Sequence, residues 1–206
     1  MPEPLTAHDY AAAAAALGCS VATIKAFAEV ESGPLGGFLP SGEPTILYEP
    51  HVFYRCGGHA FTDKTVAAGG KMWRLAYPKW VRPDAKRGIN PYGPSSIQHT
   101  KLAAAAALNR DAALQACSWG RFQILGENWR VAGYGSLQAF VNDMYEGERG
   151  QLRAFVGFCK GKGLGPILAR QEWSRAVTIF NGPGQVAAYV KRLKAAHARY
   201  AGEGSR

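Results

Sequence analysis

The spacing of apolar and polar residues along the chain predicts a mainly helical protein with one small β element. Apolar residues recur at helical intervals over about 7–17, 20–31, 136–146, 148–160, 164–180 and 185–201. An alanine-rich stretch from Ser96 predicts a further long helix or a broken pair of helices. A short β-prone run, Thr45 to Tyr48, follows a segment rich in Gly and Pro. We therefore expect helices to form most of the core.

Capping residues mark the ends of the first two helices. Thr6, with Asp9 three residues later, resembles a capping box, and Gly18 is a typical helix stop. Ser20 is a suitable N-cap for the second helix, which the Ser32-Gly33-Pro34 sequence ends. We expect these two helices to form the wall behind a functional site.

Glu31 is the first candidate for chemistry. One face of the second predicted helix carries Val21, Ile24, Phe27 and Ala28. Glu31 projects near the middle of that face, and a carboxyl group at the end of an apolar stripe should have a raised pKa. Such a group can donate a proton near neutral pH. The alternative is an ordinary frayed helix end that carries a glutamate.

Glu49 is a second candidate, because it follows the predicted strand and lies 18 residues after Glu31. A carboxylate facing a helix-borne Glu can stabilise a positively charged transition state or orient a water molecule. The alternatives are an ion pair with Arg55 or a charge at a helix N-terminus beside Pro50.

Composition and charge limit the possible partners. Hydrophobic residues make up 47% of the 206 residues and charged residues 19%, which is typical of a globular protein. The net charge of +9 indicates a polyanionic partner, such as nucleic acid, an anionic membrane surface or an acidic wall polymer. No apolar run reaches the length of a membrane span. The first residues include Glu3 and Asp9 but no Lys or Arg, so we expect no export signal.

The metal-ligating residue types are scattered. The cysteines Cys19, Cys56, Cys117 and Cys159 form no CxxC pair, and the five histidines are not in ligand spacing. We therefore predict free thiols, no metal site and no cofactor.

Two basic segments remain ambiguous. Residues 71–92 mix Lys and Arg with Trp73, Tyr77, Trp80 and Tyr92, which suit sugar rings or nucleobases as well as a satellite core. The last predicted helix has a basic face and an opposite apolar side made of Tyr189, Val190, Leu193, Ala196 and Tyr200. That helix either contacts an anionic membrane surface or packs on its own domain.

Three stretches, in this order, resemble a known superfamily. Glu31-Ser32-Gly33 resembles the catalytic Glu-Ser of lysozyme-superfamily muramidases and lytic transglycosylases. The segment from Ser118 to Ile124 resembles their Gly-containing loop followed by a Gln-Ile helix, and 180–184 resembles their Tyr-Asn-x-Gly segment with Phe in place of Tyr. The match is closer to the phage-type N-acetylmuramidase domain of endolysins that attack Gram-negative bacteria, through AEVESG, FLPSGEPTILYEPHVFYR, ACSWGRFQILGEN and FNGPG.

The resemblance, which runs from about Leu5 to Tyr200, implies a lysozyme-like α+β fold with a small β-hairpin lobe. It implies one N-acetylmuramidase catalytic domain over 1–206, without a separate wall-binding domain. Glu31 would be the general acid and Glu49 the second catalytic group. The expected substrate-binding residues are Trp119 and Phe180, through their apolar faces, and Gln123 and Asn181, through hydrogen bonds.

The implied activity is cleavage of the β-1,4 bond between N-acetylmuramic acid and N-acetylglucosamine. A lytic transglycosylase that forms 1,6-anhydro products is one alternative. A non-enzymatic basic module that binds nucleic acid or anionic surfaces is another. The expected partner is the peptidoglycan glycan strand rather than nucleic acid, and the expected state is a monomer. As an endolysin, the protein would accumulate in the host cytoplasm and reach the periplasmic wall after membrane permeabilisation.

Overall fold

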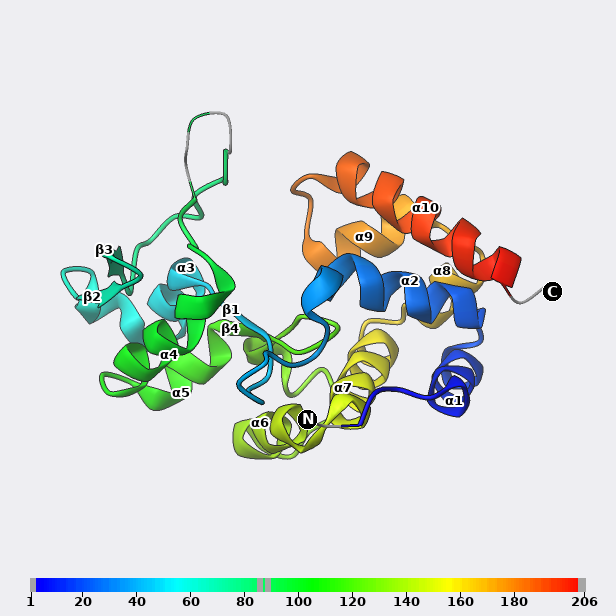
Figure 1. The fold of residues 1–206 in the computed structure, drawn as a ribbon, viewed down its shortest axis with the longest axis horizontal. Helices are drawn as coiled ribbons and strands as arrows, with labels where there is room; N and C mark the ends of the chain where they lie inside the picture. Colours follow the sequence, from blue (N-terminus) through cyan, green and yellow to red (C-terminus); the bar gives the residue numbers. More distant parts are fainter. Residues whose placement is uncertain (1–2, 85–86, 88–89, 204–206) are drawn as a thin grey trace.

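A computed structural model describes residues 3–84, 87 and 90–203 (Figure 1). The α-helices of the described residues are α1 Ala7–Leu17, α2 Val21–Ser32, α3 Pro50–Phe53, α4 Gln98–Ala106, α5 Arg110–Gln115, α6 Leu137–Glu146, α7 Glu148–Gly161, α8 Gly165–Ala169, α9 Trp173–Asn181 and α10 Val186–Glu203. The strands are β1 Ile46–Tyr48, β2 Thr65–Ala68, β3 Lys71–Arg74, β4 Cys117–Trp119 and β5 Ile124–Leu125. The fold is mainly α with small antiparallel sheets, as the sequence pattern predicts.

The elements form two groups on either side of a small central sheet (Figure 1). One group contains α1, α2 and α7 to α10, and the other contains α3, α4, α5 and the hairpin of β2 and β3. The central sheet has the strand order β1-β4-β5.

The predicted caps of the first two helices are confirmed. The hydroxyl of Thr6 accepts from the backbone N–H of Asp9, and the Asp9 carboxylate accepts from the backbone N–H of Thr6 at 2.8 Å. Gly18 ends α1 with a φ of 67°, a left-handed conformation that favours glycine. Ser20 caps α2 by accepting from the N–H of Thr23.

Helix α2 is the central element of the helical group. Its predicted apolar face is buried, since Ile24, Phe27 and Ala28 are at most 2% exposed. Helix α10 packs along α2 and buries Tyr189 and Leu193 from its own apolar side. The apolar side of the last helix therefore belongs to the domain core, which is the second of the two alternatives that its sequence left open.

The segment from 117 to 125 differs from the loop and Gln-Ile helix implied by the resemblance. It forms an antiparallel hairpin in which Trp119 pairs with Ile124, while β1 pairs with β4. The turn requires two left-handed residues, Gly120 at φ 69° and Gln123 at φ 48°. An α-helix cannot begin at a residue with that backbone conformation. The expected Gln-Ile helix is therefore wrong, and Ile124 lies in a strand.

The alanine-rich stretch is a broken pair, α4 and α5, with Asn109 capping α5, which is one of the two forms that the sequence predicts. Another predicted helix differs from the pattern. The helix expected over 164–180 is divided into α8 and α9, and Gln171 between them has a φ of 54°. The resemblance implies a small β-hairpin lobe, but the residue pattern does not place a hairpin at β2 and β3, because these strands are mostly exposed and lack clear apolar alternation.

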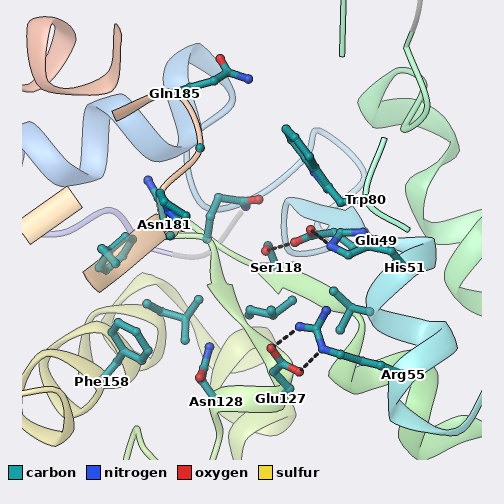
Figure 2. Close-up of a pocket in the computed structure, with 18 residues that line it drawn as sticks. Glu49, His51, Arg55, Trp80, Ser118, Glu127, Asn128, Phe158, Asn181 and Gln185 are labelled. Atoms are coloured by element: carbon teal, nitrogen blue, oxygen red, sulfur yellow. Dashed lines mark hydrogen bonds and ion pairs between the residues drawn. The ribbon is translucent and has the colours of Figure 1, made fainter. Parts of the chain in front are cut away.

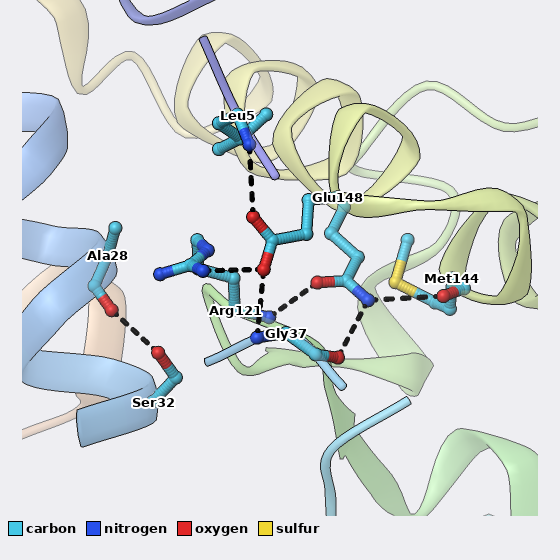
Figure 3. A network of polar contacts seen from close by, with 8 residues as sticks. Leu5, Ala28, Ser32, Gly37, Arg121, Met144 and Glu148 are labelled. Carbon is cyan, nitrogen blue, oxygen red and sulfur yellow. Dashed lines mark hydrogen bonds and ion pairs between the residues drawn. The ribbon is translucent and has the colours of Figure 1, made fainter. Parts of the chain in front are cut away.

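A buried polar network fixes the hairpin turn against α7 (Figure 3). The carboxylate of Glu148 accepts from the guanidinium of Arg121 and from the backbone N–H groups of Gly37 and Leu5. The amide of Gln151 accepts from the N–H of Arg121 at 2.7 Å and donates to the carbonyl of Gly37 at 3.0 Å. These bonds join the glycine-rich segment after α2, the β4–β5 turn and the helical group.

Candidate active site

A cleft of about 700 Å³ lies between the two groups of elements (Figure 2). Its size is within the range of pockets that bind small molecules and short oligomers. Figure 2 shows Asn181 and Gln185 on one wall, Glu49, His51 and Arg55 on the other, and Phe158 and Asn128 below. The lining residues are Glu49, His51, Val52, Arg55, Trp80, Ser118, Gln123, Ile124, Leu125, Glu127, Asn128, Phe158 and the segment 180–185.

Glu31 occupies the last turn of α2, as predicted, and its side chain is half-buried. Its Oε1 atom accepts hydrogen bonds from the hydroxyl of Tyr189 and, at 3.4 Å, from the side-chain amide of Asn181. Asn181 itself lines the cleft, so it connects the Glu31 carboxyl to the cleft wall. Burial raises the pKa of Glu31 to about 7, although the bonds from Tyr189 and Asn181 and the charge of Arg192 act in the opposite direction.

Both hydrogen bonds are made to the same oxygen of Glu31. In the neutral acid, the oxygen that accepts both bonds is the carbonyl oxygen, so Oε2 then carries the proton. When Glu31 loses that proton, the same two donors stabilise the new carboxylate.

Tyr189 is a site residue that the sequence analysis missed. It was assigned only to the apolar side of the last helix, because its hydroxyl gives no signal in a hydrophobic pattern. The contact depends on the break at 182–185, which turns α10 back onto α2. The one signal in the sequence is Phe180, which stands where the resemblance implies a tyrosine. The hydroxyl that is missing there points to another tyrosine as its replacement.

Glu49 lies on the opposite wall of the cleft, between the end of β1 and the start of α3. Its Oε1 accepts from the hydroxyl of Ser118 at 2.9 Å, and its Oε2 is 3.7 Å from Nε2 of His51. Burial raises the pKa of Glu49, while the Ser118 bond and the charge of Arg55 lower it.

Of the two alternatives for Glu49, the structure contradicts the ion pair with Arg55, whereas Glu49 does lie at a helix N-terminus beside Pro50. Arg55 donates to Glu127 instead, with an Nε to Oε2 distance of 3.0 Å. Glu49 occupies the N-cap position of α3, but its side chain makes no capping hydrogen bond. Its carboxyl group faces the cleft (Figure 2). The ion pair of Arg55 and Glu127, also in the cleft, was not identified from the sequence.

Two further predicted binding residues line the cleft. Gln123 donates its side-chain amide to the carbonyl of Gly120 at 2.8 Å, which fixes the side chain against the hairpin turn. Phe180 lines the cleft and packs against Phe27 and Phe158 with centroid distances of 5.2 and 5.4 Å.

Trp119 does not lie in the cleft, contrary to the expectation that it offers an apolar face to a sugar. It is 1% exposed, and its indole N–H donates to the carbonyl of Leu114 at 3.1 Å inside the core. The strand alternation of β4 directs Ser118 to the cleft and Trp119 to the opposite side. The structure thus assigns Trp119 a packing role.

The described part of the chain contains no group of three or more His, Cys, Asp or Glu side chains arranged to hold a metal ion. Cys19, Cys56, Cys117 and Cys159 are free thiols in the structure. Within the same described residues, no single helix is both long and apolar enough to cross a membrane, and α1 with α2 meets the criteria only as a pair bent by 107°.

Comparisons with known proteins identify the family of this chain. The N-acetylmuramidase family model matches residues 20–201. The crystal structure of the Burkholderia AP3 phage endolysin is similar, with a TM-score of 0.75 and 34% sequence identity, over 99% of this chain and 73% of that chain. The comparison with curated proteins gave no match. The family model covers most of the chain, and the similarity to the endolysin structure extends over nearly all of it. The chain therefore belongs to the N-acetylmuramidase family, whose members are peptidoglycan-degrading glycoside hydrolases of the lysozyme type.

Proposed function

We propose that Glu31 is the general acid with which this chain hydrolyses the β-1,4 bond between N-acetylmuramic acid and N-acetylglucosamine. The observation that carries the proposal is a half-buried carboxyl, with a pKa of about 7, held by a residue of the cleft wall. A carboxyl group with such a pKa is about half protonated at pH 7, and the protonated form can donate to the leaving oxygen as an oxocarbenium-like transition state forms.

Glu49 is proposed as the second catalytic group. It faces the cleft from the wall opposite Asn181, which suits a carboxylate that acts from the other side of the sugar (Figure 2). Once ionised, it would accept a proton from an attacking water and stabilise the positive charge of the transition state. The hydroxyl of Ser118 keeps the carboxyl in position. Gln123, Phe180 and Asn181 are proposed to bind the substrate along the same cleft.

The biological role proposed for the chain is that of an endolysin, since the similar Burkholderia phage protein carries that name. Such an enzyme would be made in the host cytoplasm and would act on the wall after the membrane is permeabilised. The substrate is the glycan strand of peptidoglycan, and we propose a monomer. The net charge of +9 favours contact with acidic wall polymers and anionic outer-membrane surfaces. Such contact would use the exposed charges of α10, since the apolar side of that helix packs on α2.

The test is solubilisation of purified peptidoglycan sacculi, followed as loss of turbidity. Glu31→Gln removes the acid proton with little change in shape and is expected to reduce the rate at least 100-fold. Glu29→Gln is the matched control, because Glu29 lies on the same helix but binds Arg199 and Tyr200. Equal activity of Glu31→Gln and wild type would overturn the assignment, and it would return the non-enzymatic binding module to consideration.

A further inference from the structure

One exposed aromatic side chain in the cleft has no part in the proposed proton transfers. Trp80 belongs to the segment between β3 and α4, lines the cleft and is 47% exposed. Figure 2 shows Trp80 at the rim, above Glu49 and across the cleft from Gln185. A large apolar side chain that remains exposed inside a polar cleft is typical of a binding surface.

The ring of Trp80 is held by its edge. Its indole N–H donates to the hydroxyl of Tyr92 at 2.7 Å, so the polar edge is satisfied within the protein. The backbone carbonyl of Tyr92 in turn accepts from Lys101 at 3.1 Å and from the side-chain amide of Gln98 at 2.8 Å. The orientation of the indole is therefore set before any ligand arrives.

The anchor of this arrangement is buried in α4. Lys101 and Gln98 are at most 1% exposed, and the Lys101 ammonium lies 5.3 Å from the ring centroid of Tyr48. The Gln98 side chain also accepts from the backbone N–H of Tyr48 at 3.0 Å, directly before Glu49 in the chain. The same buried pair thus positions both the strand that leads to Glu49 and the segment that holds Trp80.

We propose that Trp80 is a sugar-binding platform, on which one N-acetylhexosamine ring of the glycan strand stacks, and that Tyr92 is its positioning residue. This inference rests on the proposed function. The apolar C–H face of a pyranose would meet the electron-rich face of the indole, while the hydroxyl and acetamido groups at the ring edge remain free for the polar cleft residues. Because the indole is preorganised, binding costs little side-chain entropy.

The experiment measures binding of a defined probe by titration calorimetry. The probe is the peptide-free tetrasaccharide of alternating N-acetylglucosamine and N-acetylmuramic acid, and each variant is made in a Glu31→Gln background to prevent turnover. We expect Trp80→Ala to raise the Kd about five- to tenfold and Trp80→Phe to raise it less. Tyr145→Ala is the matched control, because Tyr145 is 46% exposed but does not line the cleft, and its Kd should not change.

A second readout distinguishes contact from general damage. Binding of the tetrasaccharide should change the indole fluorescence, and that change should be lost in Trp80→Ala. We expect Tyr92→Phe to raise the Kd about two- to threefold, because the indole loses its fixed orientation. An unchanged Kd for Tyr92→Phe would overturn the positioning role of Tyr92.

The possible failures are distinguishable. If Trp80→Ala binds the tetrasaccharide as tightly as its parent, the platform is refuted while the proposed function stands. If Glu31→Gln still cleaves the probe, the general-acid assignment fails. The sugar-binding role of Trp80 is then decided separately, by whether Trp80→Ala raises the Kd above that of its parent. If no variant binds the probe and wild type releases nothing from sacculi, both proposals fail.

Discussion

The hydroxyl of Tyr189 provides a direct way to shift the proposed acid without touching it. Tyr189→Phe removes one of the two hydrogen bonds that Glu31 Oε1 accepts, while the ring continues to fill its place between α10 and α2. Because the lost bond stabilises the carboxylate more than the neutral acid, the pKa of Glu31 should rise above its value of about 7.

The size of the shift follows from the strength of such bonds. A hydrogen bond to a charged group contributes about 1.5–3 kcal/mol, and the neutral acid retains a weaker version of it. The difference between the two protonation states is therefore about 1–1.5 kcal/mol. Since 1.36 kcal/mol corresponds to one pKa unit, the pKa of Glu31 should rise by about one unit.

The assay is the pH dependence of kcat/KM on sacculi. For a general acid, kcat/KM falls above the pKa of the acid in the free enzyme. We expect this alkaline limb near pH 7 in wild type and about one unit higher in Tyr189→Phe. Tyr200→Phe is the matched control, since Tyr200 also lies on α10 but donates to Glu29 at 2.9 Å. An alkaline limb that stays in place or moves to lower pH in Tyr189→Phe would refute the reasoning.

Three further predictions concern stability and the second carboxylate. The folded Glu31 binds its proton up to about pH 7, whereas the unfolded group releases it near 4.5, so stability from this group is lost as pH rises between these values. Glu31→Gln should therefore have a higher Tm than wild type at pH 8 and the same Tm as wild type near pH 4. A difference in Tm between variant and wild type that is equal at the two pH values would contradict the raised pKa. Trp119→Ala should lower the free energy of unfolding by about 3–5 kcal/mol in urea titrations. A large rise in KM with normal stability would contradict this packing role and indicate that Trp119 binds substrate. Ser118→Ala removes a bond that lowers the pKa of Glu49, so the acidic limb of kcat/KM should move to higher pH; an unmoved limb would argue against a role for ionised Glu49.

Local signals in the sequence were sufficient for the part of the site that lies on α2. The caps at Thr6 and Ser20, the apolar stripe and the Ser-Gly-Pro stop depend on interactions within a few residues, and all are observed. The raised pKa of Glu31 also follows from its position on that stripe. These features are predictable because helix periodicity and capping are short-range effects.

The contacts that complete the site are long-range and were not predictable in the same way. The bond from Tyr189 to Glu31 spans 158 positions, and it exists because α10 turns back onto α2. The burial of Trp119 depends on strand alternation in a hairpin, where the family resemblance implies a loop followed by a helix. The sequence does not decide whether Trp80 packs or binds a sugar or nucleobase, because side-chain exposure cannot be read from composition.

The measurement that tests the central claim most directly is mass spectrometry of the fragments that wild type and Glu31→Gln release from purified sacculi. The account predicts fragments that end in reducing N-acetylmuramic acid with wild type, and none with the variant. Ends of 1,6-anhydro-muramic acid would contradict hydrolysis and identify a lytic transglycosylase, in which Glu49 activates no water. Reducing N-acetylglucosamine ends, or the same fragments from Glu31→Gln, would contradict the bond or the acid assigned here.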